Sequence, residues 1–343
     1  MAFVKFVVKK PPTKSPLSPS GEPVGGSFML NLLKNWTLPV AMLFGTAVYL
    51  LFAFVPALDG VGETLEPFFD DILPLFMFLI LFITFCKVDF HAMRPVGWHL
   101  WVGIFQVLFV FIISASIIVF HITGDNLILL EALLTCIIGP CAAAAAVVTA
   151  KLGGSLEQMT TYTFLSNFIT AILVPVCFPL IDRSVHLDFW PAFWLILYKV
   201  CLVLVLPMLL AYIVKHRMHR FHRWVIGVKD LSFYLWAVSL AMVTGVTLRN
   251  IVHAETSVGF LLVIAAMALL LCLIQFAVGR YVGHFFNRTQ EAGQALGQKN
   301  TAFAIWIAYM YLNPLSSVGP GCYILWQNCV NSIELWQHRK SSE

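Results

Sequence analysis

A lysine stands inside one of the most apolar stretches of the chain. Lys299 belongs to the polar run Gly297–Asn300, and the nearest charged residues along the sequence are Glu291 and Glu334. An ammonium group at membrane depth costs at least ~2.5–3.5 kcal/mol on insertion scales, so it needs a partner, a water-filled cavity or a function. A polar run inside an apolar segment is also typical of a discontinuous helix at a binding site. The candidate binding residues here are Gln298, Lys299 and Asn300, and Gly297 is a candidate helix break.

A second interruption lies about 160 residues earlier. Gly139-Pro140-Cys141 falls inside another apolar stretch, where proline removes a backbone donor and opens the helical hydrogen-bond ladder. Interruptions at corresponding places in two halves of a membrane protein point to a site near the bilayer midplane. The simpler alternative is a proline kink together with one lysine whose amine reaches the membrane surface.

The composition indicates a protein with many membrane-spanning helices. The 343 residues are 60% hydrophobic and 11% charged, whereas a soluble globular protein has about 25% charged residues. The net charge of +4 lies in short loops, so it does not indicate a nucleic-acid partner. The eight cysteines fall within apolar segments without a CxxC pair. We therefore expect packing residues, with no disulfide, metal site or cofactor.

Hydropathy predicts ten membrane-spanning segments of roughly 20 residues each. No alternation typical of a membrane β-barrel competes with this interpretation. The predicted spans are about 37–58, 72–88, 99–120, 127–150, 155–181, 189–214, 228–252, 257–286, 291–312 and 315–337.

The basic residues predict the orientation. With the N-terminus inside, 17 of the 21 lysines and arginines fall on the inner side, and the exceptions are Arg183, Arg249, Lys199 and Lys299. Five acidic residues between positions 59 and 71 crowd one predicted outer loop. The positive-inside rule thus places both termini in the cytoplasm, in the plasma or inner membrane. Residues 1–35 lack a cleavable signal peptide and are expected to form a disordered cytoplasmic tail.

The ten spans divide into two halves of nearly equal length, 36–182 and 189–338. Because five is odd, the second half enters the membrane from the side opposite to the first. Two similar halves in this arrangement form an inverted repeat, which is typical of secondary transporters. The fold class predicted is an all-α polytopic membrane protein with two inverted five-helix repeats.

From about residue 72 onwards, the chain resembles the bile acid:sodium symporter family. The similar segments are Phe76–Phe90 with Arg94-Pro95, Gly139-Pro140-Cys141 with the following alanines, Ala295–Asn300, and Pro320-Gly321 with Trp326-Gln327-Asn328. The resemblance implies a panel domain of helices 1, 2, 6 and 7 and a core domain of the other six. It also implies that helices 4 and 9 are broken and cross, with substrate and sodium beside the crossing.

The resemblance carries over unevenly to individual residues. Gln106, Thr163 and Asn300 keep the ligand type that the family has for sodium or substrate, and Asn328 is a further substrate candidate. Ala145 and Ala146 stand where the family has a Ser-Asn pair that helps to bind sodium. Ala295 replaces the glutamate that both sodium sites share, and Lys299 replaces a glutamine.

These departures argue against sodium coupling by the family mechanism. Sodium needs several oxygen ligands, and an ammonium in the same cavity repels the ion by ~4 kcal/mol at 4 Å and an effective dielectric constant of 20. We expect the Lys299 ammonium to occupy the vacated cation position and to donate to Gln106, Thr163 or backbone carbonyls. It would then be either a permanent or a protonation-switched substitute for sodium.

Four other groups have two interpretations each. Glu291 either restores the lost negative charge or, as we favour, is solvated at the start of its helix. Lys199 either faces a cavity and attracts an anion or reaches the membrane surface. Glu131 either is an interfacial or paired carboxylate, as we favour, or contacts the permeation path. His216, His219 and His222 favour a basic loop facing lipid headgroups over a metal site.

The function expected is secondary active transport of an organic anion, such as a bile acid or another carboxylate or sulfonate, by alternating access. The alternatives are a proton-coupled transporter or cation/proton antiporter, and a non-transporting membrane sensor. No nucleophile–base pair or metal constellation stands in a span, so an enzyme is not expected. The expected partners are the organic anion, a proton in the coupled version, and the lipid bilayer.

Overall fold

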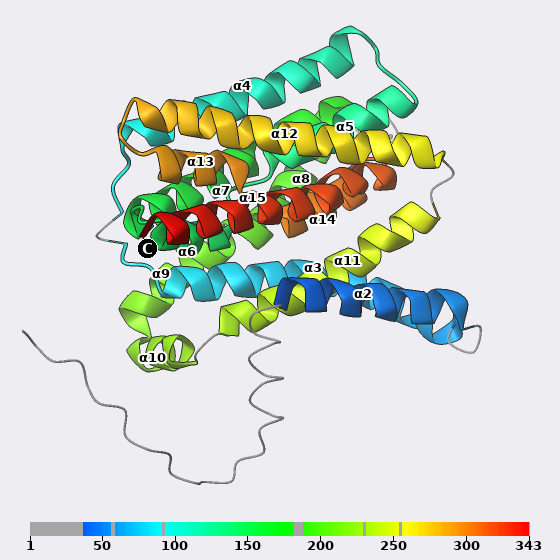
Figure 1. Ribbon diagram of the computed structural model, residues 1–343. Helices are drawn as coiled ribbons and strands as arrows, with labels where there is room; N and C mark the ends of the chain where they lie inside the picture. Colours follow the sequence, from blue (N-terminus) through cyan, green and yellow to red (C-terminus); the bar gives the residue numbers. More distant parts are fainter. Residues whose placement is uncertain are drawn as a thin grey trace, which may run out of the picture.

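The computed structural model describes residues 37–55, 59–90, 93–181, 188–228, 231–253 and 256–342. These residues form helices, and no β-strand occurs among them apart from one isolated bridge (Figure 1). The predicted tail at 1–35 lies outside the described residues.

Helices run through both halves of the chain. The first half contains α2 (Thr37–Phe54), α3 (Asp59–Cys86), α4 (Gly97–Val119), α5 (Asp125–Ile138), α6 (Ala143–Lys151) and α7 (Leu156–Ile181). The second half contains α8 (Phe189–Leu204), α9 (Leu206–Arg217), α10 (His219–Gly227), α11 (Leu231–Val252), α12 (Val258–His284), α13 (Thr289–Gly297), α14 (Thr301–Tyr311), the 3-10 helix η2 (Pro314–Ser317) and α15 (Val318–Ser342).

Four helical segments among the described residues are long and apolar enough to cross a bilayer. They are α4, α7, the pair α8–α9 and α12, and four shorter apolar helices accompany them. Large apolar side chains such as Phe44, Leu100, Trp194 and Leu262 are exposed on the outside of the bundle. Such broad apolar exposure is uncommon on soluble monomers and fits contact with lipid. The chain is an integral membrane protein.

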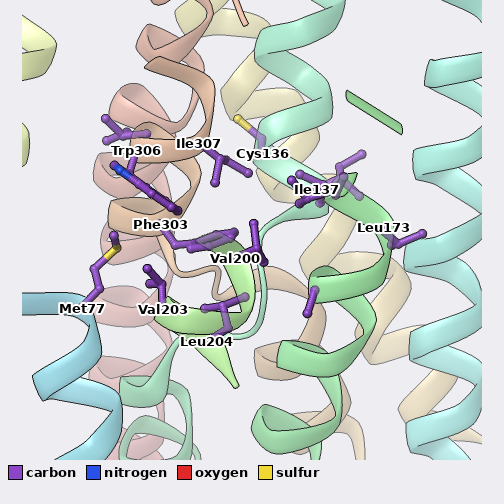
Figure 2. Close-up of a cluster of buried hydrophobic side chains, with 14 of the residues drawn as sticks. Met77, Cys136, Ile137, Leu173, Val200, Val203, Leu204, Phe303, Trp306 and Ile307 are labelled. Atoms are coloured by element: carbon purple, nitrogen blue, oxygen red, sulfur yellow. The ribbon is translucent and has the colours of Figure 1, made fainter. Parts of the chain in front are cut away.

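The helices pack in two groups. In one, α2 lies along α11, and α3 packs on α9 and α11; α8 contacts α3 but packs mainly on α7 of the other group. The other group holds α4 to α7 and α12 to α15, where α12 packs on α13 and α15 (Figure 1). A buried cluster joins the groups, with Met77 of α3, Val203 of α8 and Trp306 of α14 among its members (Figure 2). This apolar layer fixes the position of the broken helices relative to α3 and α8.

Two predicted loops are wrong. The acidic segment 59–71 belongs to the helix α3 rather than to an outer loop, since hydropathy marks the apolar part of a helix and not its ends. The basic loop around residues 215–223 is the end of α9 followed by α10. Its helical form follows from amphipathic spacing, because Val225 is buried against the bundle while its neighbours are exposed.

Candidate functional site

The two interrupted helices meet at their breaks. The helix of the fourth predicted span stops at Ile138 and resumes at Ala143, and that of the ninth stops at Gly297 and resumes at Thr301. Cys141 and Lys299 form an antiparallel bridge. The backbone N–H of Ala142 donates to Gln298 O at 2.9 Å, and that of Asn300 donates to Pro140 O at 2.8 Å. Four helix ends therefore converge on one short pair of extended segments.

Local sequence explains why the helices stop there. Pro140 has no N–H with which to continue α5, and Gly139 is already extended, with φ −55° and ψ 143°. Gly297 lies so close to α12 that a Cβ added to it would overlap the ring of Phe276. Only glycine allows this approach. The missing N–H of Pro140 and the missing Cβ of Gly297 thus explain why the predicted break residues lie at the crossing.

Polar side chains donate hydrogen bonds to the carbonyl groups at the C-terminal end of α5, which have no partner within the helix. Gln106 Nε2 donates to Ile138 O at 3.4 Å and to Gly139 O at 3.3 Å. Thr170 Oγ1 also donates to Ile138 O, at 2.8 Å. The last carbonyls of a helix carry its negative dipole end and require donors when buried. Gln106, which was predicted to bind sodium or substrate, thus forms hydrogen bonds with the protein backbone.

The end of α13 is held by α15. Tyr323 OH donates to Gly297 O at 2.7 Å. Gln327 makes a two-way contact with Lys299, because its Oε1 accepts from Lys299 N at 2.8 Å and its Nε2 donates to Lys299 O at 3.2 Å. Asn300 Oδ1 accepts from Phe303 N at 3.2 Å and caps α14. The role of Gln327 at the break is a structural finding that the sequence analysis did not predict.

The side chain of Lys299 is enclosed by protein. It is 1% exposed, and its Nζ has no hydrogen-bond partner among the described residues. The ionisable groups that interact electrostatically with the amine are the thiols of Cys141 and Cys136. Cys136 belongs to the last turn of α5, so the amine lies near the C-terminal end of that helix. The alternative in which this lysine reaches the membrane surface is wrong.

The predicted hydrogen bonds of the Lys299 amine are not present. Gln106 Oε1 accepts from Tyr162 OH at 3.5 Å. Thr163 Oγ1 donates to Met159 O at 3.0 Å and lies 3.7 Å from Cys141 Sγ. The physical reason is that both polar side chains find nearer partners on the backbone and in α7. The amine instead lies on the face that Lys299 shares with Cys141 across the bridge.

Apolar packing fills the positions where the sodium ligands of the related family would stand. Ala145, Ala146 and Ala295 are all buried, and they belong to one cluster with Trp98 and Tyr162. An alkali cation there would lose its water without gaining oxygen ligands from these three side chains.

The remaining candidates lie at varying distances from the crossing. The hydrogen bond described for Asn328 stays within α15, from Nδ2 to Ile324 O at 2.6 Å. Gln298 is buried beside the bridge, and its Oε1 has no partner among the described residues. Lys199 is half-buried on α8.

Two buried carboxylates belong to the broken helices and are bonded away from the crossing. Glu131 accepts from Ser316 Oγ at 2.6 Å and Asn313 N at 3.2 Å, which confirms that it is paired. Glu291 is 3% exposed, so the prediction that it is solvated is wrong. Its Oε1 accepts from Ser155 N at 3.0 Å and lies 3.5 Å from Arg288 Nη1. Glu291 therefore joins the start of α13 to the turn before α7.

A polar cluster ties α12, α13 and α15 together, and the ion pair and the glutamine in it were not predicted from the sequence. Arg280 forms an ion pair with Glu334. Gln294 Nε2 donates to Asn331 Oδ1 at 2.9 Å and to Glu334 Oε2 at 2.8 Å. The available signal was spacing, since Gln327, Asn331 and Glu334 recur on one face of α15.

A pocket lies between the two groups of helices. It is lined by Leu73 of α3, by Met242 and Val246 of α11, and by four residues of α14, namely Ile305, Trp306, Tyr309 and Met310. Trp306 stands five residues after Thr301, where α14 begins, which corresponds to about 7.5 Å along the helix axis.

Comparison with known families gives one match. The family model described as Sodium Bile acid symporter family matches residues 74–254. This region includes the break between α5 and α6 and ends before α12. No curated protein matches the chain.

Proposed function

Because the chain belongs to the sodium bile acid symporter family, we propose that it moves an organic anion across the membrane by alternating access, with Lys299 in place of the usual sodium. The family consists of transporters, and the membrane-embedded helices agree with that activity. Beyond membership of this family, we propose that the substrate is an organic anion and that Lys299 replaces the coupling ion.

The burial of Lys299 at the crossing carries this proposal. Helices α5 and α13 both end there, and each C-terminus has the equivalent of about half a negative charge. A cation at this point offsets the two dipole ends, as a bound alkali ion would. Lys299 supplies such a cation from within the chain, while Ala145, Ala146 and Ala295 supply no oxygen ligands.

The helix order supports a ten-span inverted repeat. The spans of the first half correspond to α2, α3, α4, α5–α6 and α7, and those of the second half to α8–α9, α11, α12, α13–α14 and α15. The broken helix is the fourth member of each half, as expected of two related five-helix units. Alternating access would then move the group containing α2, α3, α8, α9 and α11 against the other group.

The pocket between the two groups has a mainly apolar lining from α3, α11 and α14, which includes the ring of Trp306. In this state of the protein it has room for little more than a water molecule. We propose that this lining contacts the apolar part of a bile acid or another amphipathic carboxylate or sulfonate once the two groups of helices move apart. A cationic Lys299 at the break before α14 favours an anion over a neutral or cationic solute.

Two modes of transport are consistent with a lysine in this position. A permanently charged amine acts as a fixed cation, and transport is then uniport or exchange. An amine that binds and releases a proton within the cycle couples anion movement to proton movement. A cation/proton antiporter is disfavoured, because Glu131 and Glu291 are bonded to neighbouring backbone and side-chain groups away from the crossing.

The basic residues support insertion in the plasma or inner membrane with both termini in the cytoplasm. The helix α10, whose sequence includes Arg220 and Arg223, lies at the end of the bundle that also holds the C-terminal end of α15 (Figure 1).

The test is uptake of a panel of organic anions by proteoliposomes, with sodium and pH gradients imposed separately. We expect uptake of a carboxylate or sulfonate without sodium, and its loss in Lys299→Gln. Lys151→Gln is the matched control, because Lys151 is an exposed lysine at the end of α6. Uptake only with external sodium would overturn the replacement of sodium by Lys299. Saturable binding without uptake would favour the sensor.

A further inference from the structure

The helix α10 is folded back against the end of α3. The chain turns at Met218 after α9, and His222 Nε2 then donates to Cys86 O at 2.7 Å. Val225 is buried, and the rings of Phe221 and Phe82 lie 6.5 Å apart. His222 and Val225 lie one turn apart, so the side of α10 that carries them is the one that packs on the protein.

Two stripes of exposed residues cover the other sides of α10. Arg220 and Trp224 form one stripe, which Arg217 at the end of α9 precedes, and His219, Arg223 and Ile226 form the second. In each stripe basic residues come first and an apolar residue follows within a turn or two. Trp224 is 60% exposed and Ile226 is 41% exposed. This order, with positive charge beside exposed apolar surface, is typical of helices that lie in the membrane interface.

The arginines of this surface have no acidic partner among the described residues. Asp89, the carboxylate bonded to this part of the chain, pairs with Lys215 at 3.8 Å. Arg223 Nε donates to the backbone carbonyl of His219 at 3.4 Å. Arg217 and Arg220 therefore present guanidinium groups whose charge an external anion can neutralise.

The position of α10 identifies the anion. It lies beside α9 at one end of the bundle (Figure 1), and α9 exposes the apolar side chains of Leu209 and Ile213. A charged group at that level meets the phosphates of the lipid headgroups, and Trp224 and Ile226 meet the upper part of the acyl chains.

We propose that the surface formed by Arg217, Arg220, Arg223, Trp224 and Ile226 binds the headgroups of anionic phospholipids. The leaflet concerned is the one at the α10 end of the bundle, which we place in the cytoplasm. Arg217 and Arg220 contact phosphate oxygens, and Trp224 lies at the boundary with the acyl chains. This site is separate from the crossing of the broken helices and does not depend on the transported substrate.

The experiment uses the full chain in detergent–phosphatidylcholine micelles, titrated with phosphatidylglycerol brominated on its acyl chains. Bromine quenches tryptophan on contact, and the difference between the protein and its Trp224→Phe variant isolates the signal of Trp224. We expect phosphatidylglycerol to quench this signal at far lower concentration than brominated phosphatidylcholine does. In Arg217→Gln/Arg220→Gln the apparent affinity falls about 30-fold, at roughly fivefold per basic residue near an anionic surface.

Two variants serve as controls. Lys151→Gln/Lys340→Gln removes two exposed positive charges elsewhere and is expected to keep the affinity. Arg217→Lys/Arg220→Lys keeps the charges and is expected to retain most of it. An unchanged thermal midpoint in phosphatidylcholine alone shows that the variants fold. Equal affinity for both lipids, no loss in Arg217→Gln/Arg220→Gln, or displacement of the lipid by inorganic phosphate would each overturn the proposal.

Discussion

Cys141 and Lys299 face each other in an antiparallel bridge that joins the breaks of two helices. The backbone bonds on either side of this pair hold four helix ends together, and they leave both side chains on one face. Lys299 supplies the amine of the crossing, and its Nζ has no hydrogen-bond partner among the described residues.

Replacing Lys299 with methionine separates stability from activity. Methionine has a similar length and no polar atom without a partner, so we expect the free energy of unfolding to rise by roughly 1–3 kcal/mol. Transport is expected to fall to background, because the fixed cation at the two helix ends is lost. Thermal unfolding in micelles and uptake by proteoliposomes measure the two effects. A variant with full transport would show that the amine has no part in the cycle.

Gly297→Ala tests the close approach between α13 and α12. The new methyl group would overlap the ring of Phe276, and such overpacking typically costs about 1–3 kcal/mol. We expect a lower thermal midpoint, and partial recovery when Phe276→Leu is added. Gly227→Ala is the matched control, because no atom lies near a Cβ at that position. Equal midpoints for the two glycine variants would contradict the prediction.

Gln327→Leu tests the two-way contact with the backbone of Lys299. The substitution leaves a buried N–H and a buried C=O without their partner, which costs roughly 1–3 kcal/mol for each group. We expect a clear loss of stability and slower transport, since Lys299 is then poorly positioned. Ser332→Ala removes an exposed hydroxyl that bonds only to Asn328 O in the same helix. It should change the free energy of unfolding by less than about 0.5 kcal/mol.

Glu131→Gln distinguishes a structural carboxylate from a proton carrier. Glu131 accepts from Ser316 Oγ and Asn313 N, and hydrogen bonds to a charged group contribute about 1.5–3 kcal/mol. We expect lower stability, with the dependence of transport on pH unchanged. Asp125→Asn, at an exposed carboxylate in the first turn of the same helix, is the control. A shifted pH profile in Glu131→Gln alone would revive the antiporter.

The sequence by itself determined the class of protein and the two places where helices break. A chain with few charges and long apolar stretches inserts into a membrane, and there it forms helices because they satisfy the backbone hydrogen bonds within each segment. Pro140 and the Gly297–Asn300 run act on the backbone next to them, so their effect can be read locally. Lys299 can also be recognised from the local sequence, because an ammonium group within an apolar segment has a high free-energy cost whatever the packing of the helix.

Only the tertiary structure decided what each polar group contacts. Gln106 and Gln327 bind the carbonyls and N–H groups of the breaks, and Glu291 reaches Ser155, which is 136 residues away in sequence. Hydropathy gives no information on such pairings, because they depend on which helices lie side by side. The bridge between Cys141 and Lys299 is the clearest case: the breaks are local features, whereas their meeting results from the packing of two distant segments.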